Sequence, residues 1–169
     1  MKHYFTILAF VLSFSAFAQQ TENSSDLFKR HELRLNTLYA PFGAVNVDYE
    51  YLLAEKSGLG VRGNFSFRKD DEFNWSLSAY YRRYFFSKKP GSGFYIEGFA
   101  QGTEYGFQNF RSPTTTTAYN LGFGVGLGYK VLIDDKWTIE AGIGLGKNLF
   151  DTGDNKEIAR AVIGIGYRF

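Results

Sequence analysis

The stretch "LGFGVGLGYKV", residues Leu121 to Val131, places a glycine at every second position. The residues between those glycines are apolar or aromatic, so the two faces of the segment differ in chemistry. Alternation with a period of two predicts a β-strand rather than a helix. Glycine weakens the interior of a strand, so the four glycines at positions 122, 124, 126 and 128 need a physical reason in the fold.

The same alternation continues along the chain almost to its last residue. It defines eight segments, at 32–40, 44–53, 58–68, 73–86, 94–107, 118–132, 137–149 and 157–169. Tight connections at 54–57, 87–92 and 134–136 alternate with loops at 41–43, 69–72, 108–117 and 151–156. An even number of antiparallel strands, with turns at one end and loops at the other, predicts an all-β fold, an eight-stranded antiparallel up-and-down β-barrel.

One face of the predicted strands is apolar, and its aromatic residues gather at two heights. Those near the tight turns include Tyr49, Tyr51, Tyr81, Tyr129, Trp137 and Tyr167, and those near the loops include Tyr39, Trp75 and Tyr119. Between the two groups lie mainly aliphatic residues and glycine. An aliphatic belt with an aromatic girdle at each edge is typical of a surface that faces lipid, which predicts a transmembrane barrel with this face outward.

The opposite face carries the charges that would then point into the lumen. They are Arg34, Asp48, Glu50, Arg62, Arg82, Glu97, Lys130, Glu140 and Arg160. Charges enclosed in a narrow lumen must pair or hold water. We therefore expect pairs such as Arg34–Glu50 and Asp48–Arg62 within a network that plugs the lumen. A gated path for ions or protons is the alternative interpretation of the same residues.

The glycines of the opening stretch share the inward face with Asn120 and Lys130. An eight-stranded barrel has an interior just wide enough for side chains to fill. Bare positions on the last three strands leave room for large inward residues from the fourth and fifth strands, namely Tyr80, Tyr84, Tyr95 and Phe99. Bulk on one wall is matched by its absence on the other.

The amino terminus reads as a secretory signal peptide over residues 1–18. A lysine precedes an apolar run, and Ala16 and Ala18 form a small-x-small cleavage pattern. An N-terminal anchor helix is the alternative, but the run is short for a bilayer span. Residues 19–31 are polar and predict a flexible periplasmic lead-in, which leaves 32–169 for the barrel.

Composition excludes several classes of protein. Charged residues make up 21% of the chain and aromatic residues 19%, which argues against a bundle of membrane helices and against disorder. The formal net charge is only +2 and no basic or acidic block dominates, so we expect no nucleic-acid partner.

Candidate catalytic and metal-binding residues are scarce. After removal of residues 1–18 the chain keeps one histidine, His31, and it has no cysteine. Because His31 precedes the first predicted strand, away from the loop-side rim, we expect no Ser/His/Asp set. A single histidine also excludes a two-histidine metal site. The sequence therefore predicts no enzyme, no cofactor and no metal site.

The eight alternating strands, the signal peptide and the last segment, "AVIGIGYRF", resemble the small outer-membrane barrels of the OmpA/OmpX type. More narrowly, the chain is similar to uncharacterised outer-membrane β-barrel families of Gram-negative bacteria. The resemblance implies a monomer in a bilayer with lipopolysaccharide. It also implies that Ile165, Tyr167 and Phe169 form the signal read by the barrel-assembly machinery. Enzymes of this group use a histidine near the loop-side rim, whereas His31 lies at the other end.

These observations predict a non-enzymatic outer-membrane protein that supports envelope integrity or presents its loops to a partner, whose identity the sequence does not indicate. A narrow channel for ions or small solutes and a secreted soluble ligand-binding barrel are the alternatives. Acidic loop tips are candidates for lipopolysaccharide contacts bridged by divalent cations, although solvated tips have the same composition. The tips comprise Asp70, Asp71, Glu72, Asp151, Asp154 and Glu157.

Overall fold

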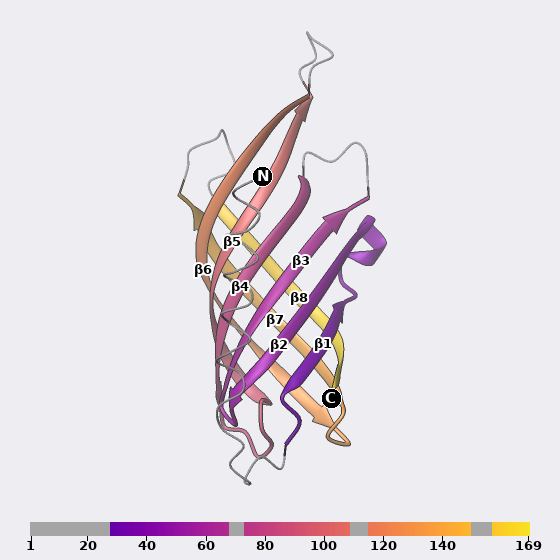
Figure 1. Cartoon of the computed structure of the whole chain (residues 1–169), viewed down its shortest axis with the longest axis vertical. Coiled ribbons are helices and arrows are strands. Elements are labelled where there is room, and N and C mark those ends of the chain that lie inside the picture. The colour runs from indigo at the N-terminus through magenta and orange to yellow at the C-terminus, as the bar shows by residue number, and fades with distance from the viewer. Residues whose placement is uncertain (1–27, 68–72, 109–114, 150–156) are drawn as a thin grey trace, which may run out of the picture.

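A computed structural model describes residues 28–67, 73–108, 115–149 and 157–169 of the chain. Eight antiparallel strands follow one another around a closed barrel in sequence order, and β1 pairs with β8 to complete it (Figure 1). The predicted up-and-down topology is confirmed. Within the described residues, no helix has the length and apolar character needed to cross a membrane.

The strand bounds agree with the predicted segments to within a few residues, with two exceptions. The strands are β1 His31–Asn36, β2 Ala44–Ala54, β3 Ser57–Ser66, β4 Phe73–Phe85, β5 Gly93–Gln108, β6 Thr115–Ile133, β7 Trp137–Asn148 and β8 Glu157–Arg168. Period-two patterning is thus sufficient to locate the strands, because a half-buried strand must alternate its two faces.

The first exception is the end of the first strand, predicted at residue 40. The strand β1 ends at Asn36, and a single 3₁₀ turn, η1 Ala40–Phe42, follows it. Pro41 lies in the first turn of η1 and cannot donate a ladder hydrogen bond. Gly43, with φ of 75°, provides the left-handed residue that closes the turn and leads into β2.

The second exception is the expected loop at 108–117. The strand β5 extends to Gln108 and β6 begins at Thr115, and these two residues are paired across the ladder. The β5–β6 hairpin consequently rises above the other strands at the loop-side end (Figure 1). Threonine favours extended backbone, so the threonine run continues the strand. The rest of the expected loop lies outside the described residues.

The chain enters the barrel earlier than predicted. The predicted signal peptide and most of the predicted lead-in lie outside the described residues, but His31 already belongs to β1. His31 N donates to the carbonyl of Phe169 at 3.2 Å, and Phe169 N donates to the carbonyl of His31 at 2.8 Å. Phe28 packs against Leu52, Tyr84 and Tyr95. The described end of the predicted lead-in therefore contacts the barrel.

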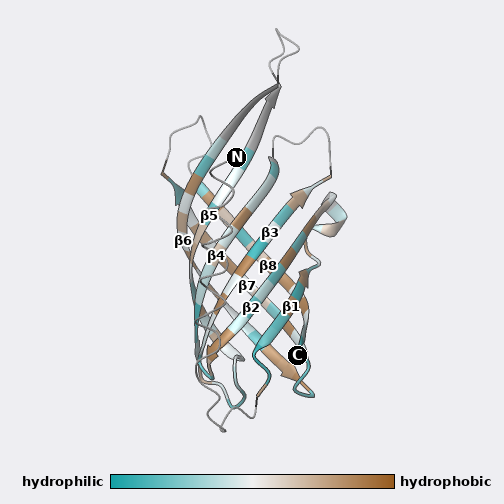
Figure 2. Ribbon diagram, viewed as in Figure 1, coloured by the Kyte–Doolittle hydropathy of each residue, from teal (hydrophilic) through white to brown (hydrophobic). Residues whose placement is uncertain are grey.

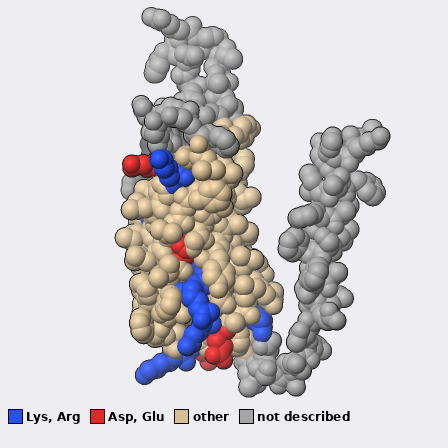
Figure 3. All heavy atoms as spheres, turned by 90° about the vertical axis from the view of Figure 1, so that its left-hand side faces the viewer, with Lys and Arg blue, Asp and Glu red and all other residues tan. Residues whose placement is uncertain are grey.

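The barrel places its apolar face outward and its charged face inward. Val125, Ile143 and Ile163 are 66%, 65% and 50% exposed, whereas Arg62 and Glu140 are 2% and 1% exposed. Brown, apolar residues alternate with polar ones along the ribbons (Figure 2), and uncharged side chains cover most of the face drawn in Figure 3. This is the arrangement expected of a barrel that faces lipid, and the reverse of that in a soluble barrel.

The glycines on β6 and β7 lie where the inward aromatic rings need space. A Cβ atom added at Gly128 or at Gly142 would come within 2.5 Å of the Tyr95 hydroxyl. One added at Gly124 would overlap the Phe99 ring. The predicted match is confirmed for Tyr95 and Phe99 on β5, whose glycine neighbours lie on β6 and β7, whereas the glycine beside Tyr80 is Gly60 on β3.

The substitution Gly128→Ala is expected to destabilise the barrel by about 1–3 kcal/mol, because the new methyl group overpacks the interior against Tyr95. The outward-facing Gly98 offers a matched control, since a Cβ atom there meets nothing within 4 Å. Heat-modifiable gel mobility of the folded protein in detergent would measure both variants. Equal stability of Gly128→Ala and Gly98→Ala would contradict this explanation of the glycines.

Candidate functional site in the barrel lumen

The charged residues predicted to line the lumen all lie inside the barrel. The basic members are Arg34, Arg62, Arg82, Lys130 and Arg160, and the acidic members are Asp48, Glu50, Glu97 and Glu140. Each is almost completely buried, with Arg160 the most accessible at 9% for its side chain. They come from all eight strands, so closing the barrel brings them together.

Arg34 on β1 is the first centre of this network. Its Nη1 lies 2.7 Å from Glu50 Oε2, and its Nη2 lies 2.5 Å from Asp48 Oδ1. The second oxygen of Asp48 accepts a hydrogen bond from Arg62 Nε at 2.6 Å. Both of the predicted ion pairs, Arg34–Glu50 and Asp48–Arg62, therefore form.

Arg82 on β4 is the second centre, and it reaches across the lumen. Its Nε donates to Glu97 Oε2 on the neighbouring β5 at 2.7 Å. Its Nη1 donates to Glu140 Oε2 on the far wall, β7, at 2.8 Å, and to Glu50 Oε2 at 3.1 Å. The guanidinium group thus joins three walls of the barrel, which its planar set of five donors makes possible.

Two further members of the network were missed by the sequence prediction. Glu32 is fully buried and lies within 3.0 Å of Lys130 Nζ and within 2.5 Å of Arg34 Nη1. Arg168 Nη2 donates to Glu32 Oε2 at 2.7 Å, and Arg168 Nη1 donates to the carbonyl of Pro90 at 2.7 Å. The signal for both was their register, because Glu32 alternates with Arg34 and Arg168 alternates with Arg160.

Aromatic side chains fill the space between the charges. The hydroxyl groups of Tyr80 and Tyr84 donate to Asp48 and Glu50, each at 2.5 Å. The Arg82 guanidinium lies over the ring of Tyr95, 4.2 Å from its centroid, and the Arg160 guanidinium lies 3.9 Å from that of Phe99. Such contacts stabilise a desolvated cation, so rings and ion pairs together occupy the middle of the lumen.

The predicted aromatic girdle lies on the outer surface. Its exposed members are Trp75, Tyr81, Tyr119, Tyr129, Trp137 and Tyr167. Tyr49 and Tyr51 are half-buried because His31 packs beside them, with its Nδ1 2.7 Å from the Tyr49 hydroxyl. The terminal residues Ile165, Tyr167 and Phe169 also point outward.

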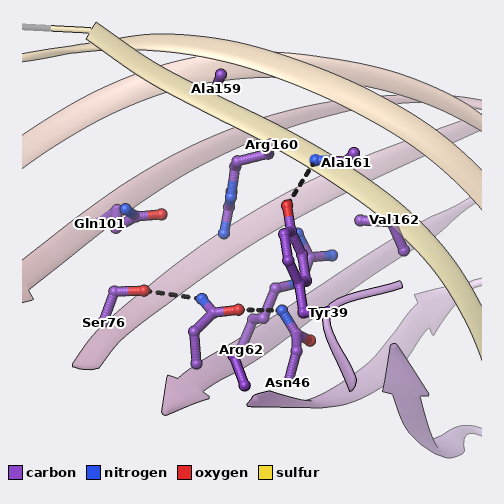
Figure 4. Close-up of a pocket in the computed structure, with 11 residues that line it drawn as sticks. Tyr39, Asn46, Arg62, Ser76, Gln101, Ala159, Arg160, Ala161 and Val162 are labelled. Carbon is purple, nitrogen blue, oxygen red and sulfur yellow. Dashed lines mark hydrogen bonds between the residues drawn. The ribbon is translucent and has the colours of Figure 1, made fainter. Parts of the chain in front are cut away.

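Tyr39 was expected in the loop-side girdle, and that expectation is wrong. Because β1 ends at Asn36, Tyr39 belongs to the connection to β2 and no longer follows strand alternation. Its hydroxyl accepts a hydrogen bond from the backbone N–H of Ala161 on β8 at 3.1 Å. Tyr39 therefore lies at the mouth of the lumen (Figure 4).

A cavity of about 230 Å³ lies at this mouth, among residues from the loop-side halves of the strands. One wall carries a chain of hydrogen bonds in which Asn46 donates to Asn64 and Asn64 donates to Ser76 Oγ (Figure 4). Arg62 and Arg160 also line the cavity.

In the part of the chain that the structure describes, no three His, Cys, Asp or Glu residues gather to hold a metal ion. His31 contacts Tyr49 and stacks on Phe169, with ring centroids 5.7 Å apart. Of the acidic loop tips, only Glu157 lies within the described residues, where it is exposed at the start of β8.

The substitution Arg82→Met is expected to destabilise the barrel by about 3–5 kcal/mol, because it leaves buried carboxylates without their cation. Arg83→Met is a matched control, since Arg83 is the next residue of β4 and is exposed on the outside. Thermal unfolding in detergent, followed by circular dichroism, would measure the difference. Equal losses in the two variants would argue against a buried network that holds the strands together.

Comparison with known proteins places this geometry in a family and a fold. No curated protein matches the sequence. The N-terminal β-barrel domain of Pseudomonas aeruginosa OprF is similar in structure, with a TM-score of 0.58 and 16% identity over 84% of this chain and 98% of that chain. Neisserial surface protein A is also similar, with a TM-score of 0.54 and 12% identity over 83% and 95%. Residues 4–160 match the family described as "Protein of unknown function (DUF3575)". The protein therefore belongs to the DUF3575 family and has the fold of the small outer-membrane barrels of the OmpA/OmpX type.

Proposed function

We propose that this protein is a non-enzymatic integral protein of the bacterial outer membrane whose lumen is plugged by charged and aromatic side chains. In this role it supports envelope integrity or presents its loops to a binding partner. The observation that carries the proposal is the contact of Arg82 with Glu97, Glu50 and Glu140, which spans the lumen from β4 to β7.

The outer surface supports a location in lipid. Leu145 is 71% exposed, and the aromatic residues Tyr119 and Trp137 are 65% and 52% exposed towards opposite ends of the barrel. Exposing this apolar area to water would be unfavourable by about 25 cal/mol for each Å². The partners of this surface are the bilayer and its lipopolysaccharide, and the barrel inserts as a monomer. A secreted soluble barrel would need the opposite assignment of the two faces.

The lumen supports a plug rather than a channel. Below the loop-side cavity, the next void beside Arg62, Tyr95 and Glu97 has a volume of only about 10 Å³. That volume corresponds to roughly one water molecule. The fully buried side chains of Arg82, Tyr84 and Lys130 occupy the lumen beyond it. A hydrated ion therefore has no path unless several ion pairs separate together.

We propose no enzymatic activity because His31 is not placed to act as a general base. Its ring is held at the turn-side end between Tyr49, Tyr51 and Phe169. A general base must lie within hydrogen-bonding reach of a nucleophile or a bound substrate. The Tyr49 hydroxyl is the contact made by His31 Nδ1, and it faces the outer surface rather than the lumen.

In a planar lipid bilayer, the wild-type barrel is expected to give no regular single-channel conductance steps. The double variant Arg82→Ser with Glu140→Ser removes the cross-lumen pair without leaving an unpaired charge between these two residues, and it is expected to conduct small ions. Arg83→Ser serves as the control, because that arginine is outside the lumen. Regular steps from the wild-type protein would favour the narrow channel instead, and recovery from cells without detergent would favour a soluble barrel.

Recognition by the barrel-assembly machinery is expected to depend on Phe169. In cells, Phe169→Ser should leave most of the protein unassembled, while the purified variant should still fold in detergent. Phe86→Ser is the control, since Phe86 is 94% exposed at the β4–β5 turn. Membrane fractions analysed by heat-modifiable mobility would measure assembly. Normal assembly of Phe169→Ser would remove the terminal residue from the proposed signal.

A further inference from the structure

The described lumen holds one more basic than acidic side chain. Besides the residues predicted from the sequence, the network includes Glu32 and Arg168, which balance each other at the turn-side end. The uncompensated positive charge therefore belongs to the remaining members. Because buried charge is costly without a partner, the location of that excess identifies where the lumen favours an anion.

The excess lies around Glu97, just below the loop-side cavity. Three arginine side chains share this single carboxylate, with Arg82 Nε at 2.7 Å, Arg160 Nη1 at 3.3 Å and Arg62 Nη1 at 3.5 Å. The other acidic contact of Arg62 is Asp48, and Asp48 already pairs with Arg34 at 2.5 Å. The nearby carboxylates consequently neutralise only part of the positive charge of Arg62 and Arg160.

Arg62 also has a donor that the network does not use. Its Nη2 is buried and has no hydrogen-bond partner among the residues that the structure describes. The residue as a whole is 2% exposed, so water outside the barrel cannot solvate the group freely. A buried guanidinium donor without an acceptor costs free energy, which a bound anion would recover.

Both arginines face the loop-side cavity of about 230 Å³. Arg160 extends into it from β8, and the Arg62 side chain rises from the opposite wall beside Tyr39 (Figure 4). Asn64, Ser76 and Gln101 add hydroxyl and amide groups to the lining. The cavity thus combines two cations, an unused donor and neutral polar groups around a space larger than one water molecule.

We propose that this cavity is a binding site for a small, water-soluble phosphate or phosphate monoester, held between Arg62 and Arg160. The planar donors of a guanidinium match the oxygen atoms of a phosphate group in pairs. The single excess charge suits a monoanion. Lipid headgroups lie on the outer surface of the barrel, so the ligand enters from the solvent at the loop side. This site is additional to the proposed plug and does not depend on it.

The test uses the mature barrel folded in an uncharged detergent free of phosphate, titrated at constant ionic strength in sodium chloride. Inorganic phosphate and methyl phosphate are the two probes, followed by calorimetry and by ³¹P NMR line broadening. The wild-type protein should bind one phosphate per barrel in a saturable manner. Tighter binding of methyl phosphate would identify a monoester as the natural ligand, and tighter binding of inorganic phosphate would identify the free ion.

The variant Arg160→Gln should weaken binding by about tenfold or more, because it removes a charge-assisted contact. Arg62→Gln should do the same, and gel mobility would establish that it folds; if it does not fold, Arg160→Gln alone carries the test. Arg83→Gln, which removes an equal charge from the outer surface, should leave binding unchanged. The absence of saturable binding to the wild type, or equal weakening by Arg160→Gln and Arg83→Gln, would overturn the proposal.

Discussion

The pairing of charge across neighbouring strands is the constraint on which the rest of the barrel depends. On the lumen face, opposite charges lie directly across the ladder five times, as Glu32 with Arg168, Arg34 with Asp48, Asp48 with Arg62, Arg82 with Glu97, and Lys130 with Glu140. A slip of one residue would turn every side chain of a strand to the other face. It would expose charges to lipid and bury aliphatic residues in the lumen, so the ion pairs and the hydrophobic belt specify the same register.

This constraint explains why large inward side chains concentrate on β4 and β5 and glycines on β6 and β7. The β4 and β5 walls bring Tyr80, Tyr84 and Tyr95, whose hydroxyl groups and rings solvate the buried ions in place of water. The adjoining strands β6 and β7 carry glycine where the rings of Tyr95 and Phe99 need space. In the lipid environment proposed for the barrel, the weak strand propensity of glycine matters little because every backbone N–H and C=O must be paired anyway.

The two-residue alternation and the strand register made the strands, their faces and the ion pairs between neighbouring strands predictable from the sequence. Strand alternation assigns each residue to a face, and a hairpin places opposite charges such as Asp48 and Arg62 side by side. Contacts across the lumen, such as Arg82 with Glu140, could not be predicted, because they depend on the stagger with which the barrel closes. Tyr39 was misplaced because β1 ends at Asn36, before it. Glu32 was omitted because it stands at the edge of the predicted barrel.

Side chains close the turn-side end of the lumen, whereas a cavity opens at the loop-side end. This difference determines from which end a ligand could enter. At the turn side, Arg168 binds Glu32 and the carbonyl groups of Pro90 and Gly91, and Phe28 packs beneath Leu52. At the loop side, Arg62 and Arg160 face a cavity, and their positive charge is only partly neutralised. A ligand that enters from the loop side would meet Arg62 and Arg160 first and would then reach the ion pairs around Arg34 and Arg82. The proposed anion site at the loop-side mouth is therefore compatible with the proposed plug.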